Sequence, residues 1–155
     1  MKKKPPPAKQ IDLGPLPGLA GYALRRAQLA VFRDFDRVFA KSGIRPAQYS
    51  ALCVIERNPG LTQSAVAGAL GIKRANFTVL FNTLEARGLA RRGAGRGDRR
   101  SHALTLTPAG AAFTAKLHAL ARAHERAVCK TLTPDGRRRL FAALNALRAA
   151  SKPGE

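Results

Sequence analysis

The chain has 155 residues, of which 45% are hydrophobic, and it carries 28 Lys and Arg against 9 Asp and Glu, a formal net charge of +19. This length fits one domain, the hydrophobic fraction excludes wholesale disorder, and no apolar run reaches the roughly 18 residues of a transmembrane helix. So large a positive surplus indicates a polyanionic partner, nucleic acid before anionic membrane, and the excess of arginine over lysine favours bidentate contacts with phosphate or guanine.

The N-terminal segment and the cysteines bear on where the protein works. The first ten residues, MKKKPPPAKQ, are basic and proline-rich, and residues 1–15 lack periodicity, so we expect a flexible basic arm there. No apolar stretch of the kind found in secretory signals follows this start. Two cysteines, Cys53 and Cys129, are too few for a disulfide framework, so the simplest compartment is a reducing cytoplasm.

A long amphipathic helix is predicted over about residues 17–41, ending before Gly43. Its apolar residues recur three or four positions apart, as the inward face of a helix requires. This stripe comprises Leu24, Ala27, Val31, Phe35 and Val38, widened by Phe32 and Phe39.

Three shorter helices are predicted between residues 46 and 87. Capping and breaking residues set their bounds. The first helix runs from Pro46 to the breaking segment Asn58-Pro59-Gly60, and the second runs from the cap Thr62 to about Leu70. The third follows the turn residue Gly71 and runs from Lys73 to Arg87, before Gly88. Apolar spacing sets their inward positions, which are Val66, Ala69 and Leu70 in the second helix and Phe77, Leu80, Phe81 and Leu84 in the third.

A β-hairpin and two further helices complete the predicted fold. Leu89–Arg92 and Ser101–Leu106 alternate in polarity, and the segment GAGRGDR between them is too rich in glycine for a helix. Thr107-Pro108 and Thr133-Pro134 each open a helix, so two helices should fill residues 108–150. The expected fold is a single, mainly α domain over residues 16–155 with a two-stranded β wing.

Two short helices joined by a glycine turn and followed by a basic hairpin have the order of a winged helix-turn-helix. In such motifs the second helix lies in the major groove of DNA, where each base pair presents a distinct pattern. No acidic residue lies within residues 72–84, and six arginines against one acid, Asp98, lie within residues 87–100, which suits insertion of the hairpin into a minor groove. The expected DNA contacts are Thr62, Gln63, Lys73, Arg74, Ala75, Asn76, Thr78, Val79, Asn82, Arg87, Arg96, Asp98, Arg99 and Arg100.

Individual roles follow from side-chain chemistry. Arg74 can fork onto guanine, and Asn76 or Asn82 can pair with adenine. Thr78 can meet a phosphate or a thymine methyl group. The residues expected to hold phosphates and set the register are Thr62, Gln63, Lys73 and Arg87.

A known bacterial family shares the ordered motifs of this region. They are the LGI turn, the LEARGL end of the recognition helix, the wing motif Asp98-Arg99-Arg100, and LTPAG at the start of the next helix. In this order and spacing they resemble the multiple-antibiotic-resistance-regulator (MarR) family of transcription factors, over about residues 17–150. The resemblance places the wing arginine of the family at Arg100 and its aspartate at Asp98. Two residues depart from the family pattern: Lys73 stands where the family usually has a serine- or threonine-type cap, and Val79 stands where it often has a polar residue. The resemblance therefore implies no operator sequence.

The resemblance implies a homodimer that binds double-stranded DNA at a pseudo-palindromic operator, as a repressor relieved by a ligand. It assigns dimerisation to helices 17–41 and 108–150 and DNA binding to a winged helix over residues 46–106. The apolar stripes of the first and last helices give an independent reason for a partner chain, because a small winged-helix unit cannot cover them.

Members of this family commonly release DNA when a small aromatic acid enters a crevice between the two halves. The resemblance therefore implies a small aromatic or other anionic effector, and the basic charge also permits an acyl-coenzyme A thioester. An aromatic stripe at helical spacing is also what a plain core would show. The candidate lining residues are Tyr22, Arg26, Phe32, Phe35, Tyr49 and Cys53.

Other interpretations are weaker. A non-specific architectural DNA-binding protein would also be strongly basic. A redox switch would use Cys53 or Cys129, and the latter lies beside Arg126 and Lys130, which can lower its pKa. No metal or other cofactor is expected, because the histidines of the predicted helix over residues 108–128 fall on different faces. Scattered acids and the lack of a Gly-rich phosphate loop argue against an enzyme.

Overall fold

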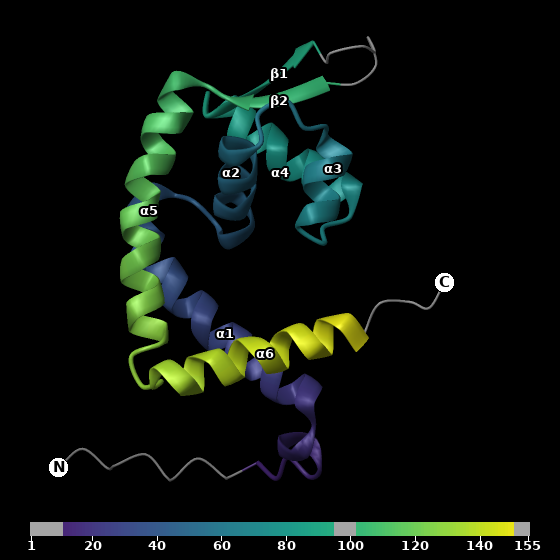
Figure 1. The fold of residues 1–155 in the computed structure, drawn as a ribbon, viewed down its shortest axis with the longest axis vertical. Helices are drawn as coiled ribbons and strands as arrows, with labels where there is room; N and C mark the ends of the chain where they lie inside the picture. Colours follow the sequence, from purple (N-terminus) through teal and green to yellow (C-terminus); the bar gives the residue numbers. More distant parts are fainter. Residues whose placement is uncertain (1–10, 95–101, 151–155) are drawn as a thin grey trace, which may run out of the picture.

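The structure is a computed structural model that describes residues 11–94 and 102–150. Its helices and strands follow the predicted order (Figure 1). They are α1 (Ala20–Phe39), α2 (Pro46–Arg57), α3 (Gln63–Ala69), α4 (Arg74–Ala86), β1 (Ala90–Ala94), β2 (His102–Leu106), α5 (Pro108–Val128) and α6 (Pro134–Ala150), with 3-10 helices at Leu16–Gly18 and Ala40–Ser42.

The elements form two groups joined by the long helix α5. One group contains α2, α3, α4 and the hairpin, and α5 runs from the hairpin to the other end of the molecule, where α1 and α6 lie (Figure 1). The strands are antiparallel, with Ala90 opposite Leu106 and Ala94 opposite His102, so β1 extends two residues beyond its predicted end. The free edge of β2 bonds to the loop before α3, because Gly60 N donates to Leu104 O at 2.9 Å. This loop closes the sheet against the helices.

Local signals in the sequence explain where the helices begin and end. Thr62 Oγ1 accepts from Ala65 N at 3.2 Å, which confirms the predicted cap, and Thr107 Oγ1 accepts from Gly110 N at 2.9 Å at the helix start predicted for Thr107-Pro108. Gly71 adopts φ +64°, a left-handed conformation that favours glycine, at the turn between α3 and α4. The first long helix starts later than predicted, because the prolines before Ala20 form a separate 3-10 turn.

The core lies where α2, α3, α4 and β2 meet. As predicted, Phe77, Phe81 and Leu84 of α4 are buried, while Leu80 is partly buried. The prediction for α3 is wrong at Ala69, which is exposed, whereas its neighbour Ala67 is buried beside Val66. Successive helical residues are rotated by about 100°, so an inward arc centred between residues 66 and 67 leaves residue 69 outside it.

Large apolar side chains remain uncovered on the elements at the far end of α5. Phe32 of α1 is 42% exposed and Phe141 of α6 is 47% exposed, and α6 contains no buried residue. The burial of α1 is confined to its last turns, at Phe35 and Phe39. Within the described residues, no helix is long and apolar enough to span a membrane.

Candidate nucleic-acid interface and ligand cavity

The outward face of α4 is basic and free of internal contacts at its start. Lys73, Arg74, Ala75 and Asn76 are exposed, and Val79 is 67% exposed. The side chains of Lys73 and Arg74 form no hydrogen bond or ion pair with the residues that the structure describes. Their positive charges are therefore available to an external anion such as a DNA phosphate.

Two of the predicted DNA contacts are brought together across the turn between α3 and α4. The half-buried Thr78 hydroxyl lies 3.2 Å from Gln63 Oε1 and 3.0 Å from Arg74 O, both acceptors. The hydroxyl therefore bonds within the motif, and the amide nitrogen of Gln63 is left to donate outwards. Gln63 can thus meet a phosphate while Thr78 holds it in place.

Asn82 is tied to the wing. Its Oδ1 accepts from Arg92 Nη2 at 2.6 Å, and Arg92 also pairs with Glu85 and lies over the Phe81 ring, 4.7 Å from its centroid. A bidentate contact with adenine needs both the oxygen and the nitrogen of the amide. Because Arg92 holds the amide oxygen of Asn82 in this contact with the wing, the exposed Asn76 is the better candidate for adenine.

Arg87 holds the end of α4 against neighbouring elements. Its Nη1 and Nη2 donate to Gly43 O and Ser42 O, each at 2.9 Å, and its guanidinium lies 5.4 Å from the centre of the Phe113 ring. A phosphate contact at Arg87 stays a prediction and would use the remaining N–H groups. The predicted wing contacts, which lie outside the described residues, are Arg96, Asp98, Arg99 and Arg100.

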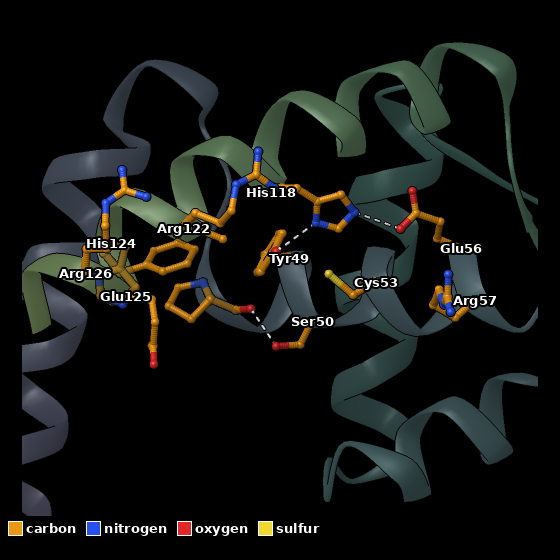
Figure 2. A pocket seen from close by; sticks show the side chains of 13 residues that line it. Tyr49, Ser50, Cys53, Glu56, Arg57, His118, Arg122, His124, Glu125 and Arg126 are labelled. Atoms are coloured by element: carbon orange, nitrogen blue, oxygen red, sulfur yellow. Dashed lines mark hydrogen bonds and ion pairs between the residues drawn. The ribbon is translucent and has the colours of Figure 1, made fainter. Parts of the chain in front are cut away.

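A cavity of about 900 Å³ lies between α2 and α5, and Phe35 of α1 also lines it. Aromatic rings supply much of its wall, since Phe35, Tyr49, His118 and His124 contact one another in pairs. Its lining consists of Phe35, Pro46, Tyr49, Ser50, Cys53, Glu56, Arg57, His118, Ala121, Arg122, His124, Glu125 and Arg126. Figure 2 shows these side chains, most of which belong to α2 and α5.

Hydrogen bonds cross the cavity wall from α2 to α5. His118 Nε2 lies 2.9 Å from Glu56 Oε2, and its Nδ1 lies 3.0 Å from the Tyr49 hydroxyl (Figure 2). Burial raises the pKa of Tyr49 well above its usual range, so the phenol stays protonated. Burial also raises the pKa of the Cys53 thiol beside it, which keeps this cysteine in its unreactive form.

Charge at the cavity is unbalanced towards positive. Arg57, Arg122 and Arg126 are exposed and form no hydrogen bond or ion pair with the described residues. The two acids of the lining are both engaged, Glu56 with His118 and Glu125 with Arg137. The cavity therefore offers three unpaired guanidinium groups to an anionic ligand.

Half of the predicted lining residues reach the cavity. Phe35, Tyr49 and Cys53 line it, whereas Tyr22, Arg26 and Phe32 do not. The last three belong to the first two-thirds of α1, which lies away from α2 and leaves Phe32 exposed.

The sequence prediction missed the contribution of α5. His118, Arg122 and Arg126 are spaced four residues apart, which places them on one face of a helix. That spacing was a usable signal, but which element faces this stripe depends on the fold.

The structure corrects one prediction about Cys129. Burial and a hydrogen bond to Glu125, 3.5 Å from Sγ, raise the pKa of this thiol, so the expected lowering by Arg126 and Lys130 is wrong. Within residues 11–94 and 102–150, no three His, Cys, Asp or Glu side chains are grouped to hold a metal ion.

Comparison with known proteins identifies the family. The MarR family profile matches residues 42–101. The transcriptional repressor CouR, in its structure bound to a 23-mer DNA duplex, is 41% identical, with a TM-score of 0.84 over 90% of this chain and 99% of that chain. The chain belongs to the MarR family. It is a winged-helix, DNA-binding transcription regulator, as the resemblance implied.

Two further relatives bear on the role of this MarR-family chain. CouR bound to p-coumaroyl-CoA is 38% identical, with a TM-score of 0.83 over 90% of this chain and 98% of that chain. A transcriptional regulatory protein for the hcr operon of Thauera aromatica is 40% identical over 105 residues, 67% of this chain. The matched region spans only 63% of the length of the Thauera protein.

Proposed function

We propose that this chain is a homodimeric repressor that leaves a pseudo-palindromic operator when a coenzyme A thioester of an aromatic acid binds the cavity between α2 and α5. The observation that carries the proposal is the combination of aromatic walls with three unpaired arginines in one cavity. The similarity to CouR bound to p-coumaroyl-CoA supports the same ligand class. Acting on chromosomal DNA, the protein would work in the cytoplasm.

In the proposed complex, α4 reads the major groove. The exposed Arg74 forks onto guanine, Asn76 pairs with adenine, and Lys73 and Gln63 hold phosphates. The wing of each protomer reaches the neighbouring minor groove, as expected for Arg99 and Arg100. CouR bound to a DNA duplex supports this arrangement.

A second copy of the chain is the proposed cover for the exposed apolar faces of α1 and α6. Leu24 and Phe32 of α1 and Leu140 and Phe141 of α6 are each about 40% exposed or more. Water disfavours apolar surface of this extent, and burial gains about 25 cal/mol per Å². A twofold dimer would set its recognition helices about 34–36 Å apart, one turn of DNA.

The unpaired arginines favour a thioester of coenzyme A over a free acid. A free aromatic acid carries one carboxylate, which a single guanidinium can bind. A coenzyme A thioester carries several phosphate charges, enough for Arg57, Arg122 and Arg126 together. Phosphates held there would also reduce the positive field that attracts DNA.

Fluorescence anisotropy tests the proposal. The full chain is titrated against the DNA flanking its own gene and against a scrambled duplex, at about 150 mM salt, where non-specific binding is weak. We expect preference for one site by about 10³-fold or more, and release by p-coumaroyl-CoA but not by p-coumarate or coenzyme A alone. Equal binding to several flanking and scrambled duplexes would favour an architectural protein instead.

A pair of variants tests the effector site. The double variant Arg122→Ala/Arg126→Ala should require at least tenfold more p-coumaroyl-CoA for release, because each lost charge-assisted contact weakens binding. Lys116→Ala is the matched control, since Lys116 is an exposed cation on the same helix that does not line the cavity. An unchanged response in the double variant would remove these arginines from the effector site.

A further inference from the structure

The hydrogen bonds of His118 fix the direction in which the Tyr49 hydroxyl donates. An ionised carboxylate only accepts hydrogen bonds, so the 2.9 Å contact with Glu56 requires the proton of the neutral imidazole to be on Nε2. The other nitrogen, Nδ1, is then an acceptor. Because Nδ1 lies 3.0 Å from the Tyr49 hydroxyl, Tyr49 is the donor in that bond.

This orientation sets what the cavity offers to a ligand. With its hydrogen committed to His118, the Tyr49 oxygen faces other partners only as an acceptor. The Cys53 sulfur, a weak hydrogen-bonding partner, also lies beside this hydroxyl. The Tyr49 ring itself packs among aromatic rings, with its centroid 5.5 Å from that of Phe39 and 6.4 Å from that of Phe35.

We propose that Tyr49, oriented by Glu56 through His118, selects effectors whose aromatic ring carries a hydrogen-bond donor, such as a phenolic hydroxyl. This inference rests on the proposed function, because it specifies the acyl group of the thioester that the cavity binds. Tyr49 contacts the ring donor directly. Glu56 and His118 are positioning residues that act through Tyr49 (Figure 2).

Two matched thioesters measure this preference. The 4-hydroxycinnamoyl and 4-fluorocinnamoyl thioesters of coenzyme A differ at one ring position, where fluorine is close to a hydroxyl in size but cannot donate. Calorimetric titration of the full chain at pH 8 gives both dissociation constants. One net hydrogen bond predicts a two- to twelvefold preference for the hydroxylated ligand, about the range of a typical bond.

Three variants separate selection from folding. In Tyr49→Phe, which keeps the ring packing, the ratio of the two dissociation constants should fall to about one. In Glu56→Gln the amide can donate to His118, so the direction of the Tyr49 hydroxyl is no longer fixed and the ratio should fall. Lys116→Ala is the control, because Lys116 is exposed on the same helix as His118 and does not line the cavity. Its ratio should equal that of the unmodified chain.

The outcomes distinguish this inference from the proposed function. Equal affinity of the unmodified chain for both thioesters, or preference for the fluorinated one, would overturn the inference and leave the thioester effector standing. A hydroxyl preference that persists in Tyr49→Phe would assign selection to another residue and would also overturn it. Failure of both thioesters to bind at all would overturn the proposed function and this inference together.

Discussion

Among the glycines of the described residues, Gly110 near the start of α5 has the least room for a side chain. A Cβ added there would lie 1.7 Å from Leu89 O, 2.7 Å from Leu89 C and 3.0 Å from Leu89 Cα, whereas ordinary contacts begin at 3.4 Å. All three atoms are backbone, so no side-chain rotation relieves the clash. The variant Gly110→Ala must therefore separate α5 from Leu89, the residue just before β1.

The size of the effect follows from what that separation breaks. Thr107 N donates to Leu89 O at 3.1 Å, and Thr107 Oγ1 donates to Gly88 O at 2.6 Å. Losing two hydrogen bonds costs about 2 kcal/mol, and overpacking of a tight contact costs about 1–3 kcal/mol. We therefore expect Gly110→Ala to lower the free energy of unfolding by about 3–5 kcal/mol, or roughly 6–20 °C in Tm.

Urea and thermal denaturation of the purified variant measure this loss. Gly68→Ala is the matched control, because Gly68 lies within α3 with no atom within 4 Å of an added Cβ. Alanine favours a helix by about 0.5–1 kcal/mol over glycine, so this control should be slightly more stable than the parent chain. A Gly110→Ala variant within about 1 kcal/mol of the parent would refute the reasoning.

Further predictions concern DNA contacts, acid stability and the cysteines. Arg74→Ala should weaken the free energy of binding by about 1–3 kcal/mol through one base pair of the operator. Lys73→Ala should instead weaken the binding of operator and scrambled DNA equally. Fluorescence anisotropy with single-base operator variants checks both. Hydrogen bonds from Arg37 and then His124 lower the pKa of Asp34, so its contribution to stability is present above about pH 4 and is lost as the pH falls through the lowered pKa. Asp34→Asn should accordingly flatten the decline of the unfolding free energy below pH 4, and an unchanged slope would contradict this. Because both thiols have raised pKa values, serine at Cys53 and Cys129 should leave DNA binding under peroxide unchanged from the parent chain.

Most of the fold could be predicted because its signals are local. The caps Thr62 and Thr107 and the left-handed Gly71 each act within a few residues, and the stripe of α4 follows from helical spacing alone. Ala69 was misplaced because α3 is only seven residues long, which is too short for spacing to fix its orientation. In such a helix, packing decides which face is buried.

The DNA-reading surface was also accessible from sequence, but its internal bonds were not. That Arg74 and Asn76 are exposed follows from the same periodicity that buries Phe77. The bond from Arg92 to Asn82 joins the wing to the recognition helix, and only the hairpin geometry brings the two side chains together. For the same reason the sequence indicated Tyr49 for the cavity but not its partner His118, 69 residues away.

The packing of α2 limits how an effector can act under the proposed function. One face of α2 lines the cavity, while its buried Leu52 and Ile55 belong to the same core as Phe81 and Leu84 of α4. Release by a factor of 10²–10³ requires about 2.7–4.1 kcal/mol, and sliding α2 against α4 would disrupt a core whose single large side chains each contribute about 2–5 kcal/mol. An effector on α2 therefore has two routes: it adds negative charge near the DNA, or it turns the winged helix as one body and changes the spacing of the two recognition helices.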